Sequence, residues 1–118
     1  MKNQQKLKLN FQPTYRKEIE NCQKKTTLRL GIQYQRKFKE GDEFDLTIGW
    51  SEEKSEKVSS GKIVGILTKK VKNLTQFDLL GESVDCSYPV MIPYILSHIY
   101  RREILPDTFV TIIYWRYI

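Results

Sequence analysis

Polar and apolar residues alternate in residues 6–11 and 44–50, which is the period of a strand with one buried face. Two further stretches, residues 25–30 and 62–68, contain the β-branched residues that strands favour. Residues 108–117 carry apolar side chains on both faces, so we expect this strand to lie inside the sheet. Residues 44–50 and 62–68 are expected to pair as a hairpin joined by a polar loop.

Three other stretches show the three- and four-residue spacing of apolar residues that helices bury. They cover residues 15–21, 73–80 and 89–101, with Thr14 and Thr75 as the expected N-caps of the first two. The buried stripe expected in the third helix consists of Met91, Ile92, Ile95, Leu96 and Ile99. The predicted order is strand, helix, three strands, two helices and a final strand, a set that a curved sheet closes into a small barrel flanked by helices.

Length and composition point to one globular domain. The 118 residues are 40% hydrophobic and 29% charged, with six glycines and four prolines, which excludes the disordered, collagen-like and disulfide-scaffold classes. We expect residues 1–118 to form a single domain, with residues 1–6 frayed. No stretch approaches the ~20 apolar residues that span a bilayer, and no apolar segment follows the charged start. The sequence therefore predicts a cytoplasmic protein with no membrane partner.

Positive charge is concentrated in the first third of the chain. Residues 1–40 contain eleven Lys or Arg and three Glu, a balance of 11 − 3 = +8. Residues 41–118 contain nine Lys or Arg and eleven Asp or Glu, a balance of 9 − 11 = −2. Such a concentration attracts polyanions, RNA among them, although a solvated face that keeps the protein soluble has the same composition.

The chain lacks the residues of several common kinds of active site. His98 is the only histidine and is expected to face solvent, which disfavours catalytic triads that need a histidine base. No His, Cys or carboxylate residues have the spacing of a metal site, and no phosphate-binding glycine loop is present. Cys22 and Cys86 are expected to be unpaired thiols. We therefore expect no metal and no cofactor, and any catalysis would use threonine, lysine and a carboxylate.

These residue types cluster in one place, Lys24 to Arg29, with the sequence KKTTLR. Together with the preceding Ile19 to Cys22, this stretch resembles the opening motif of the ASCH domain family, Gly-x-Lys-Thr-x-Thr-x-Arg. Lys24, Thr27 and Arg29 match its Lys, second Thr and Arg, and the later Gly-Asp turn of the family is matched at residues 41–42. The resemblance extends over residues 7–117 and implies an α+β, PUA-like small mixed β-barrel flanked by about three short helices.

The resemblance also implies chemistry. ASCH domains are associated with RNA-related roles, and some small members are amidohydrolases that act on N4-acetylcytidine. In those enzymes a Lys, a Thr and a carboxylate work together, which here implies Lys24, Thr27 and Asp85, with Glu82 as the alternate carboxylate. The sequence departs from the family motif at Cys22, which replaces the glycine, and at Lys25, which replaces the first Thr. Asp85 is also one methylene shorter than the family's Glu.

Strand geometry constrains how these side chains meet. Thr27 and Arg29 are two residues apart, so they share one face of the strand and are expected to enter the same cleft. Lys24 is an odd number of residues from Thr27, so it approaches Thr27 only if it lies in the turn before the strand. A threonine hydroxyl needs a base to become a nucleophile, and a desolvated, neutral lysine amine can be that base.

Three hypotheses follow, and whether the chain is an enzyme stays open. In the first, the cleft binds RNA or a nucleoside: Arg29 hydrogen-bonds the ligand, Lys24 and Lys25 contact phosphates, and Tyr34 or Tyr88 stacks on a base. In the second, the chain is an amidohydrolase of N4-acetylcytidine-like nucleosides. In the third, it is a protein-interaction domain with a vestigial cleft. Purely structural roles remain the alternative for each residue, such as an ion pair between Arg29 and Asp42.

Overall fold

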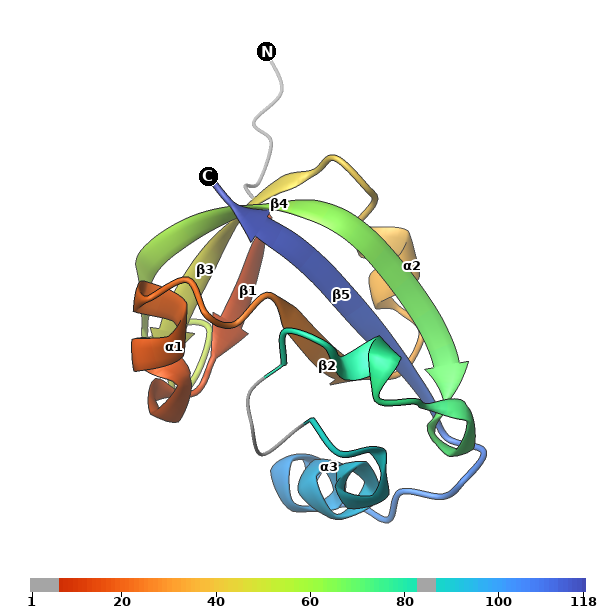
Figure 1. The fold of residues 1–118 in the computed structure, drawn as a ribbon. Coiled ribbons are helices and arrows are strands. Elements are labelled where there is room, and N and C mark those ends of the chain that lie inside the picture. Colours follow the sequence, from red (N-terminus) through yellow and green to blue (C-terminus); the bar gives the residue numbers. More distant parts are fainter. Residues whose placement is uncertain (1–6, 83–86) are drawn as a thin grey trace.

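The computed structural model describes residues 7–82 and 87–118, which contain one five-stranded sheet. The strands are β1 (Lys8–Phe11), β2 (Thr26–Leu30), β3 (Glu43–Gly49), β4 (Ser55–Lys70) and β5 (Phe109–Tyr117). Their spatial order is β1-β3-β4-β5-β2, and the long strands β4 and β5 arch over the others, so the sheet curls into a half-barrel (Figure 1). All five predicted strands are present, and β5 lies inside the sheet, as its two apolar faces predicted.

The β3–β4 hairpin differs from its prediction in one respect. Residues from Ser55 onward already pair with β3, with Gly49 opposite Ser55 and Glu43 opposite Lys62. The polar loop is therefore confined to a few residues at the tip, and the apolar half of β4 pairs with β5 instead. Polar side chains are accommodated in this part of β4 because they project into solvent while the main chain completes its hydrogen bonds with β3.

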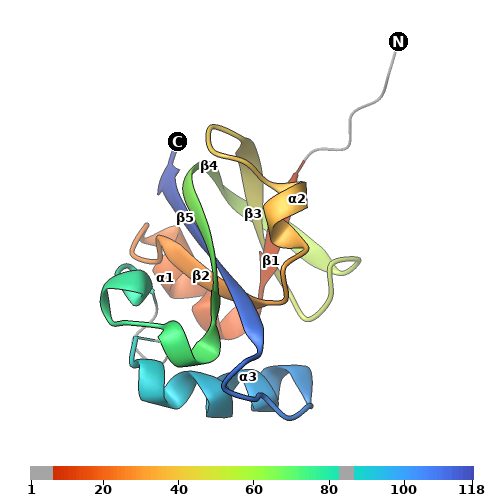
Figure 2. The same cartoon turned by 90° about the vertical axis from the view of Figure 1, so that its right-hand side faces the viewer.

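Short helical segments surround the sheet. They are α1 (Arg16–Glu20), α2 (Tyr34–Lys37) and α3 (Ile92–Tyr100), together with 3-10 turns at Pro13–Tyr15, Val71–Asn73, Phe77–Leu79 and Pro89–Met91. Helices α2 and α3 lie at opposite ends of the sheet (Figure 2). Two predictions were wrong: Thr14 makes no capping hydrogen bond, because the 3-10 turn already begins at Pro13, and residues 73–80 form separate turns rather than one helix.

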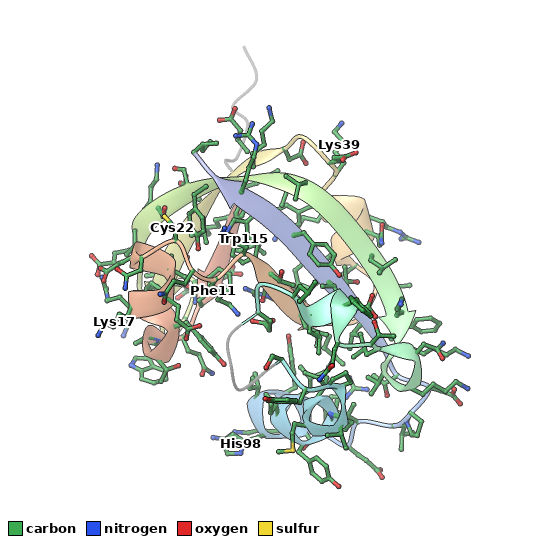
Figure 3. The ribbon with its side chains drawn as sticks, viewed as in Figure 1. Phe11, Lys17, Cys22, Lys39, His98 and Trp115 are labelled. Atoms are coloured by element: carbon green, nitrogen blue, oxygen red, sulfur yellow. The ribbon has the colours of Figure 1, made fainter. Side chains whose placement is uncertain are left out.

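The apolar side chains form two clusters, one on each side of the sheet. The first fills the concave side, where Phe11 and Trp115 pack with their ring centroids 5.8 Å apart (Figure 3). The second lies between the sheet and α3, which contributes Ile92 and Leu96. The predicted stripe of α3 is correct for these two residues and wrong for Met91 and Ile99, which are 45% and 40% exposed.

Asp78 is the centre of a hydrogen-bond network in the segment between β4 and α3. Its carboxylate accepts hydrogen bonds from the Lys69 ammonium at 2.9 Å and from the Thr75 N–H at 2.8 Å, and the Thr75 hydroxyl accepts from the Asp78 N–H at 3.3 Å. Burial by itself would raise the pKa of Asp78, but the hydrogen bonds from Lys69 and Thr75 outweigh it and hold the pKa below its usual value. Thr75 therefore accepts from the turn as a cap would, although the predicted helix is absent and the residue that precedes the 3-10 turn is Gln76.

Replacing Asp78 by asparagine is expected to lower the free energy of unfolding by about 1–2 kcal/mol at pH 7, since a charge-assisted network is lost. Because the folded-state pKa is lowered, the stability from ionised Asp78 is present above the unfolded value of about 4 and disappears as pH falls further. Urea unfolding at several pH values checks this. If the difference in free energy of unfolding between wild type and Asp78→Asn stays the same in acid, the stabilising role of the ionised Asp78 carboxylate is contradicted.

Candidate functional site

The sheet leaves a gap between its two outermost strands, β1 and β2, which we call the seam. The two strands stand at opposite ends of the strand order and do not pair with each other. The side chain of Arg29 on β2 crosses the seam and donates a hydrogen bond from Nη2 to the Asn10 carbonyl of β1 at 2.9 Å. The half-barrel is therefore held at this edge by a side chain rather than by a strand ladder.

A cavity of about 110 Å³ opens at the seam, which we call the seam cavity. Its walls come from β1 and the turn after it, from β2 and the turn before it, from α3, and from the segment after the Phe77–Leu79 turn that carries Glu82. The lining residues are Asn10, Phe11, Gln12, Tyr15, Lys24, Thr27, Leu28, Arg29, Glu82, Ile92, Ile99 and Tyr100. A closed apolar cavity of about 150 Å³ holds a benzene ring, so this smaller, partly open space admits one edge of a planar ring while the rest of the ring lies toward the opening.

The seam cavity contains a buried ion pair between Lys24 and Glu82. Their side chains are only 3% and 2% exposed, and the Lys24 ammonium contacts a Glu82 carboxylate oxygen. Lys24 Nζ also lies 4.9 Å from the centroid of the Tyr15 ring and 5.8 Å from that of Phe11. Removing two charges from water costs several kcal/mol per ion, so such a pair is a weak source of stability and a frequent feature of functional sites.

Two hydrogen bonds hold the segment that carries Glu82 next to the segment that carries Lys24. The Lys25 N–H donates to the Gly81 carbonyl at 2.8 Å, and the Thr26 hydroxyl donates to the Leu80 carbonyl. These bonds fix the segment that carries Glu82 against the start of β2. Gly81 has φ +85°, and a Cβ there would lie 2.9 Å from the Thr26 hydroxyl oxygen, so only glycine allows this close approach.

Tyr117 positions the turn that carries Lys24. Its hydroxyl donates a hydrogen bond to the Lys24 carbonyl, and the Trp115 N–H donates to the next carbonyl, that of Lys25, at 3.0 Å. Burial raises the pKa of the Tyr117 phenol to about 12. Burial also raises the pKa of Tyr114, the neighbouring tyrosine of β5.

Replacing Tyr117 by phenylalanine is expected to lower the free energy of unfolding by about 1–2 kcal/mol at neutral pH, because the Lys24 carbonyl loses its donor. A raised folded-state pKa means that the neutral phenol stabilises the fold fully below pH ~10, and that this contribution is lost as pH rises toward 12. The free energy of unfolding should therefore fall less steeply with rising pH in Tyr117→Phe than in the wild type. The fall that remains in this variant is attributed to Tyr114, whose pKa is also raised. Equal slopes in denaturant titrations at pH 9 to 12 would argue against this role.

Arg29 is held from three sides at the seam. Besides its bond to Asn10, its Nε lies 3.4 Å from the Thr27 hydroxyl oxygen, and its guanidinium carbon lies 4.8 Å from the centroid of the Phe11 ring. Asn10 is itself fixed by hydrogen bonds to the Gly49 carbonyl at 3.0 Å and from the Thr47 hydroxyl at 2.8 Å. Within residues 7–82 and 87–118, no carboxylate forms an ion pair with Arg29.

The structure brings four of the predicted site residues together, since Lys24, Thr27, Arg29 and Glu82 all line the seam cavity. Lys24 precedes β2, which begins at Thr26, so it occupies the turn that the geometric argument required. Asp85 lies outside the described residues. Asp42 accepts a hydrogen bond from the Lys39 N–H at 3.0 Å and does not pair with Arg29.

Three other predicted residues do not line the seam cavity. Lys25 is exposed. Tyr34 is on α2, where its ring stacks on Phe38 at a centroid distance of 6.3 Å. Tyr88 is 53% exposed and precedes the turn that leads into α3. Strand and helix spacing could not reveal these positions, because they depend on which segments meet in three dimensions.

The aromatic residues that do line the seam cavity, Phe11, Tyr15 and Tyr100, were missed. They come from β1, from the turn after it and from α3, and no sequence pattern indicates that these segments converge on β2. The Tyr100 hydroxyl accepts a hydrogen bond from the Leu30 N–H at 3.2 Å, which fixes the end of α3 against β2. The 40% exposure of Ile99 has the same origin, since Ile99 faces the seam cavity rather than the core.

A wider groove of about 640 Å³ adjoins the seam cavity, between α3 and the segment from Gln12 to Glu18. The two spaces share Gln12, Tyr15 and Ile99, so they are continuous. The remaining lining residues of the groove are Thr14, Glu18, Tyr94, Ile95 and His98. His98 is exposed, as predicted, and lies on α3 (Figure 3).

No helix in the described ranges is long and apolar enough to cross a membrane. Among the same residues, no group of three or more His, Cys, Asp or Glu side chains is arranged to hold a metal ion. Cys22 is an exposed, unpaired thiol, and its backbone lies in the left-handed region at φ +58°, which glycine adopts more readily than other residues.

Comparison with known proteins identifies the fold. No family model matches the sequence, and no curated protein matches it. Three solved structures share the fold at low sequence identity. An ASCH domain from Lactobacillus crispatus JV V101 is 10% identical with a TM-score of 0.58, over 88% of this chain and 70% of that one. Protein EF3133 from Enterococcus faecalis V583, described by the family model DUF984, is 10% identical with a TM-score of 0.62, over 89% and 67%.

The third is the hypothetical protein PH0355, which is 18% identical with a TM-score of 0.65, over 97% of this chain and 100% of that one. Identities this low establish the architecture alone. They confirm the ASCH-like α+β fold that the resemblance over residues 7–117 predicted, with the expected small barrel present as a curled half-barrel flanked by short helices.

Proposed function

We propose that this chain, which has the fold of an ASCH domain, binds a nucleobase or nucleoside in the seam cavity. The observation that carries the proposal is the seam cavity itself, which combines apolar and aromatic walls with a fixed guanidinium. Such a combination of apolar lining and a few oriented polar groups is typical of small-molecule sites. Its volume of about 110 Å³ suits the hydrogen-bonding edge of a base.

Arg29 is the expected anchor of the ligand. Two of its N–H groups are directed at Asn10 and Thr27, and a guanidinium carries five donors in a fixed plane. The remaining donors suit a carbonyl oxygen such as O2 of a pyrimidine. Because the charges of Lys24 and Glu82 cancel, the described lining of the seam cavity keeps the positive charge of Arg29, which favours an electron-rich ligand edge.

The adjoining groove favours a nucleoside over RNA. Among its described lining residues there is one carboxylate, Glu18, and no lysine or arginine, so a phosphate would meet no positive partner. Gln12, Thr14 and Tyr94 offer neutral polar groups to a sugar. Phosphate contacts through the exposed Lys25 remain the RNA alternative, and they predict an affinity that falls steeply with salt.

Calorimetric titration with cytidine tests the proposal. Arg29→Met is expected to weaken cytidine binding by at least about tenfold, since a charged hydrogen bond to the ligand is lost. Arg36→Met, which alters an exposed arginine of α2, is the matched control and should leave binding unchanged. Circular dichroism checks that both variants fold. Absence of binding by the wild type would favour the hypothesis of a vestigial cleft, and equal binding by the two variants would exclude Arg29 as the anchor of the ligand.

A second candidate function, hydrolysis of N4-acetylcytidine-like nucleosides, is favoured by a specific observation. The buried pair of Lys24 and Glu82 and the hydroxyl of Thr27 line the same small cavity. A buried lysine can lose its proton readily, and a carboxylate in contact with it can accept that proton, so the pair is suited to proton transfer. This assigns the carboxylate role to Glu82, the alternate carboxylate of the sequence prediction.

The chemistry then runs through these three side chains. Glu82 takes a proton from the Lys24 ammonium, and the resulting amine takes the Thr27 hydroxyl proton as the oxygen attacks the acyl carbon. Arg29 faces the negative oxygen of the tetrahedral intermediate. When the C–N bond breaks, Lys24 returns a proton to the leaving N4 amine and cytidine departs. Lys24 then takes a proton from the water that attacks the acyl ester and passes it to the Thr27 oxygen as the ester bond breaks. Acetic acid leaves and loses its proton to solvent, and Glu82 returns its proton to Lys24, which restores the starting state.

A further inference from the structure

The register of β2 against β5 determines which main-chain groups point toward the seam. The Lys25 carbonyl accepts from the Trp115 N–H at 3.0 Å, and the Gly31 N–H donates to the Phe109 carbonyl at 2.9 Å. In an antiparallel pair, successive residues alternate between pointing toward the partner strand and pointing away from it. The main-chain groups of Thr27 and Arg29 therefore bond to β5. The main-chain groups of Thr26, Leu28 and Leu30 point to the opposite edge, which faces the seam.

Leu30 is the last residue on this open edge, and both of its main-chain groups have hydrogen-bond partners within the protein. The Leu30 N–H donates to the Tyr100 hydroxyl at 3.2 Å, and the Leu30 carbonyl accepts from Gln33 Nε2 at 3.2 Å. At the start of the strand, the segment 80–81 contacts Lys25 and Thr26. Both ends of the edge are thus covered by neighbouring segments.

Leu28 lies midway along this edge and lines the seam cavity. Its N–H and carbonyl point the same way, away from β5, and no partner for either lies among the described residues. On the facing strand β1, the Asn10 carbonyl is already bonded to Arg29. A main-chain donor and acceptor that face a mostly apolar cavity gain free energy when a ligand completes their hydrogen bonds.

We propose that the N–H and carbonyl of Leu28 recognise the ligand through a planar edge on which a donor stands next to an acceptor. This inference rests on the proposed function and assigns its specificity. Cytidine and N4-acetylcytidine both present such an edge, an N4–H beside the N3 lone pair. The N3 atom accepts from the Leu28 N–H, and the N4–H donates to the Leu28 carbonyl. Recognition by main-chain groups distinguishes heterocycles by the donors and acceptors on one edge of the ring, and it needs no charged contact.

Amide hydrogen exchange measured by NMR on the full chain tests the proposal directly. In the free protein, the Leu28 amide is expected to exchange faster than those of Thr27 and Arg29, which bond to β5. Saturating cytidine should slow the Leu28 amide by at least about tenfold and leave its two neighbours unchanged. Equal protection of the three amides in the free protein would overturn the proposal.

A ligand series separates this inference from the proposed function. N4,N4-dimethylcytidine lacks the N4–H donor and is expected to bind at least about tenfold more weakly than cytidine. The control 5-methylcytidine adds a methyl group and keeps the donor, so it should bind like cytidine. Cytidine that binds without any change at Leu28, or equal affinities for all three nucleosides, refutes the main-chain role alone. Failure of every nucleoside to bind refutes the proposed function and the inference together.

Discussion

Replacing Lys24 by methionine is expected to lower the free energy of unfolding by about 3–5 kcal/mol, the usual cost of removing one partner of a buried ion pair. The Glu82 side chain is 2% exposed, so its carboxylate would lose its ammonium partner in a place that water hardly reaches. Urea unfolding followed by circular dichroism measures the effect. Since most small domains have a total stability of about 5–15 kcal/mol, this single change would remove a large part of it.

Two further variants serve as controls for the predicted effect of Lys24→Met on stability. Lys57→Met breaks an ion pair with Asp45 in which the lysine side chain is 50% exposed, and it is expected to cost less than about 1 kcal/mol. The double variant Lys24→Met/Glu82→Met removes both buried charges and should recover most of the lost stability, because apolar side chains replace buried pairs at little cost. A double variant as unstable as Lys24→Met alone would show that the fold itself needs the two charges.

The sequence predicted the fold well because its strands carry their own signals. Alternation and β-branched residues identified all five strands, and two apolar faces identified β5 as an interior strand. The missed details share one cause. Residues such as Glu56 and Lys57 are polar and exposed, yet they belong to β4 because their main chain pairs with β3. Pairing of this kind depends on the partner strand and leaves no local pattern.

Only the part of the candidate site that lies within a recognisable sequence motif could be predicted from the sequence. Lys24, Thr27 and Arg29 were found because they lie within six residues of one another and resemble a family motif. Glu82 is far away in sequence, and the hydrogen bond between the Gly81 carbonyl and the Lys25 N–H, which brings it to Lys24, is a tertiary contact. The walls supplied by β1 and α3 likewise follow from the closure of the half-barrel.

Replacing Thr27 by valine is expected to abolish the release of cytidine from N4-acetylcytidine, with a loss of at least about a thousandfold, if the chain is the proposed hydrolase. Valine has nearly the shape of threonine and favours strands, so the fold and the seam cavity should persist. Only the hydroxyl that forms the acyl ester is removed. Chromatography of the nucleosides measures the rate, and calorimetry shows whether cytidine still binds.

Matched variants decide whether the Thr27 hydroxyl acts as a nucleophile or only supports Arg29. Thr27→Ser keeps a hydroxyl and should retain part of the turnover. Thr68→Val makes the same chemical change on β4, at a hydroxyl 3.1 Å from that of Thr111 and outside the seam cavity, and should leave turnover unchanged. Turnover in Thr27→Val close to that of the wild type would exclude Thr27 as the nucleophile. A wild type that binds cytidine and releases none from the acetylated nucleoside would leave binding as the function, because the two activities require different groups of the same cavity.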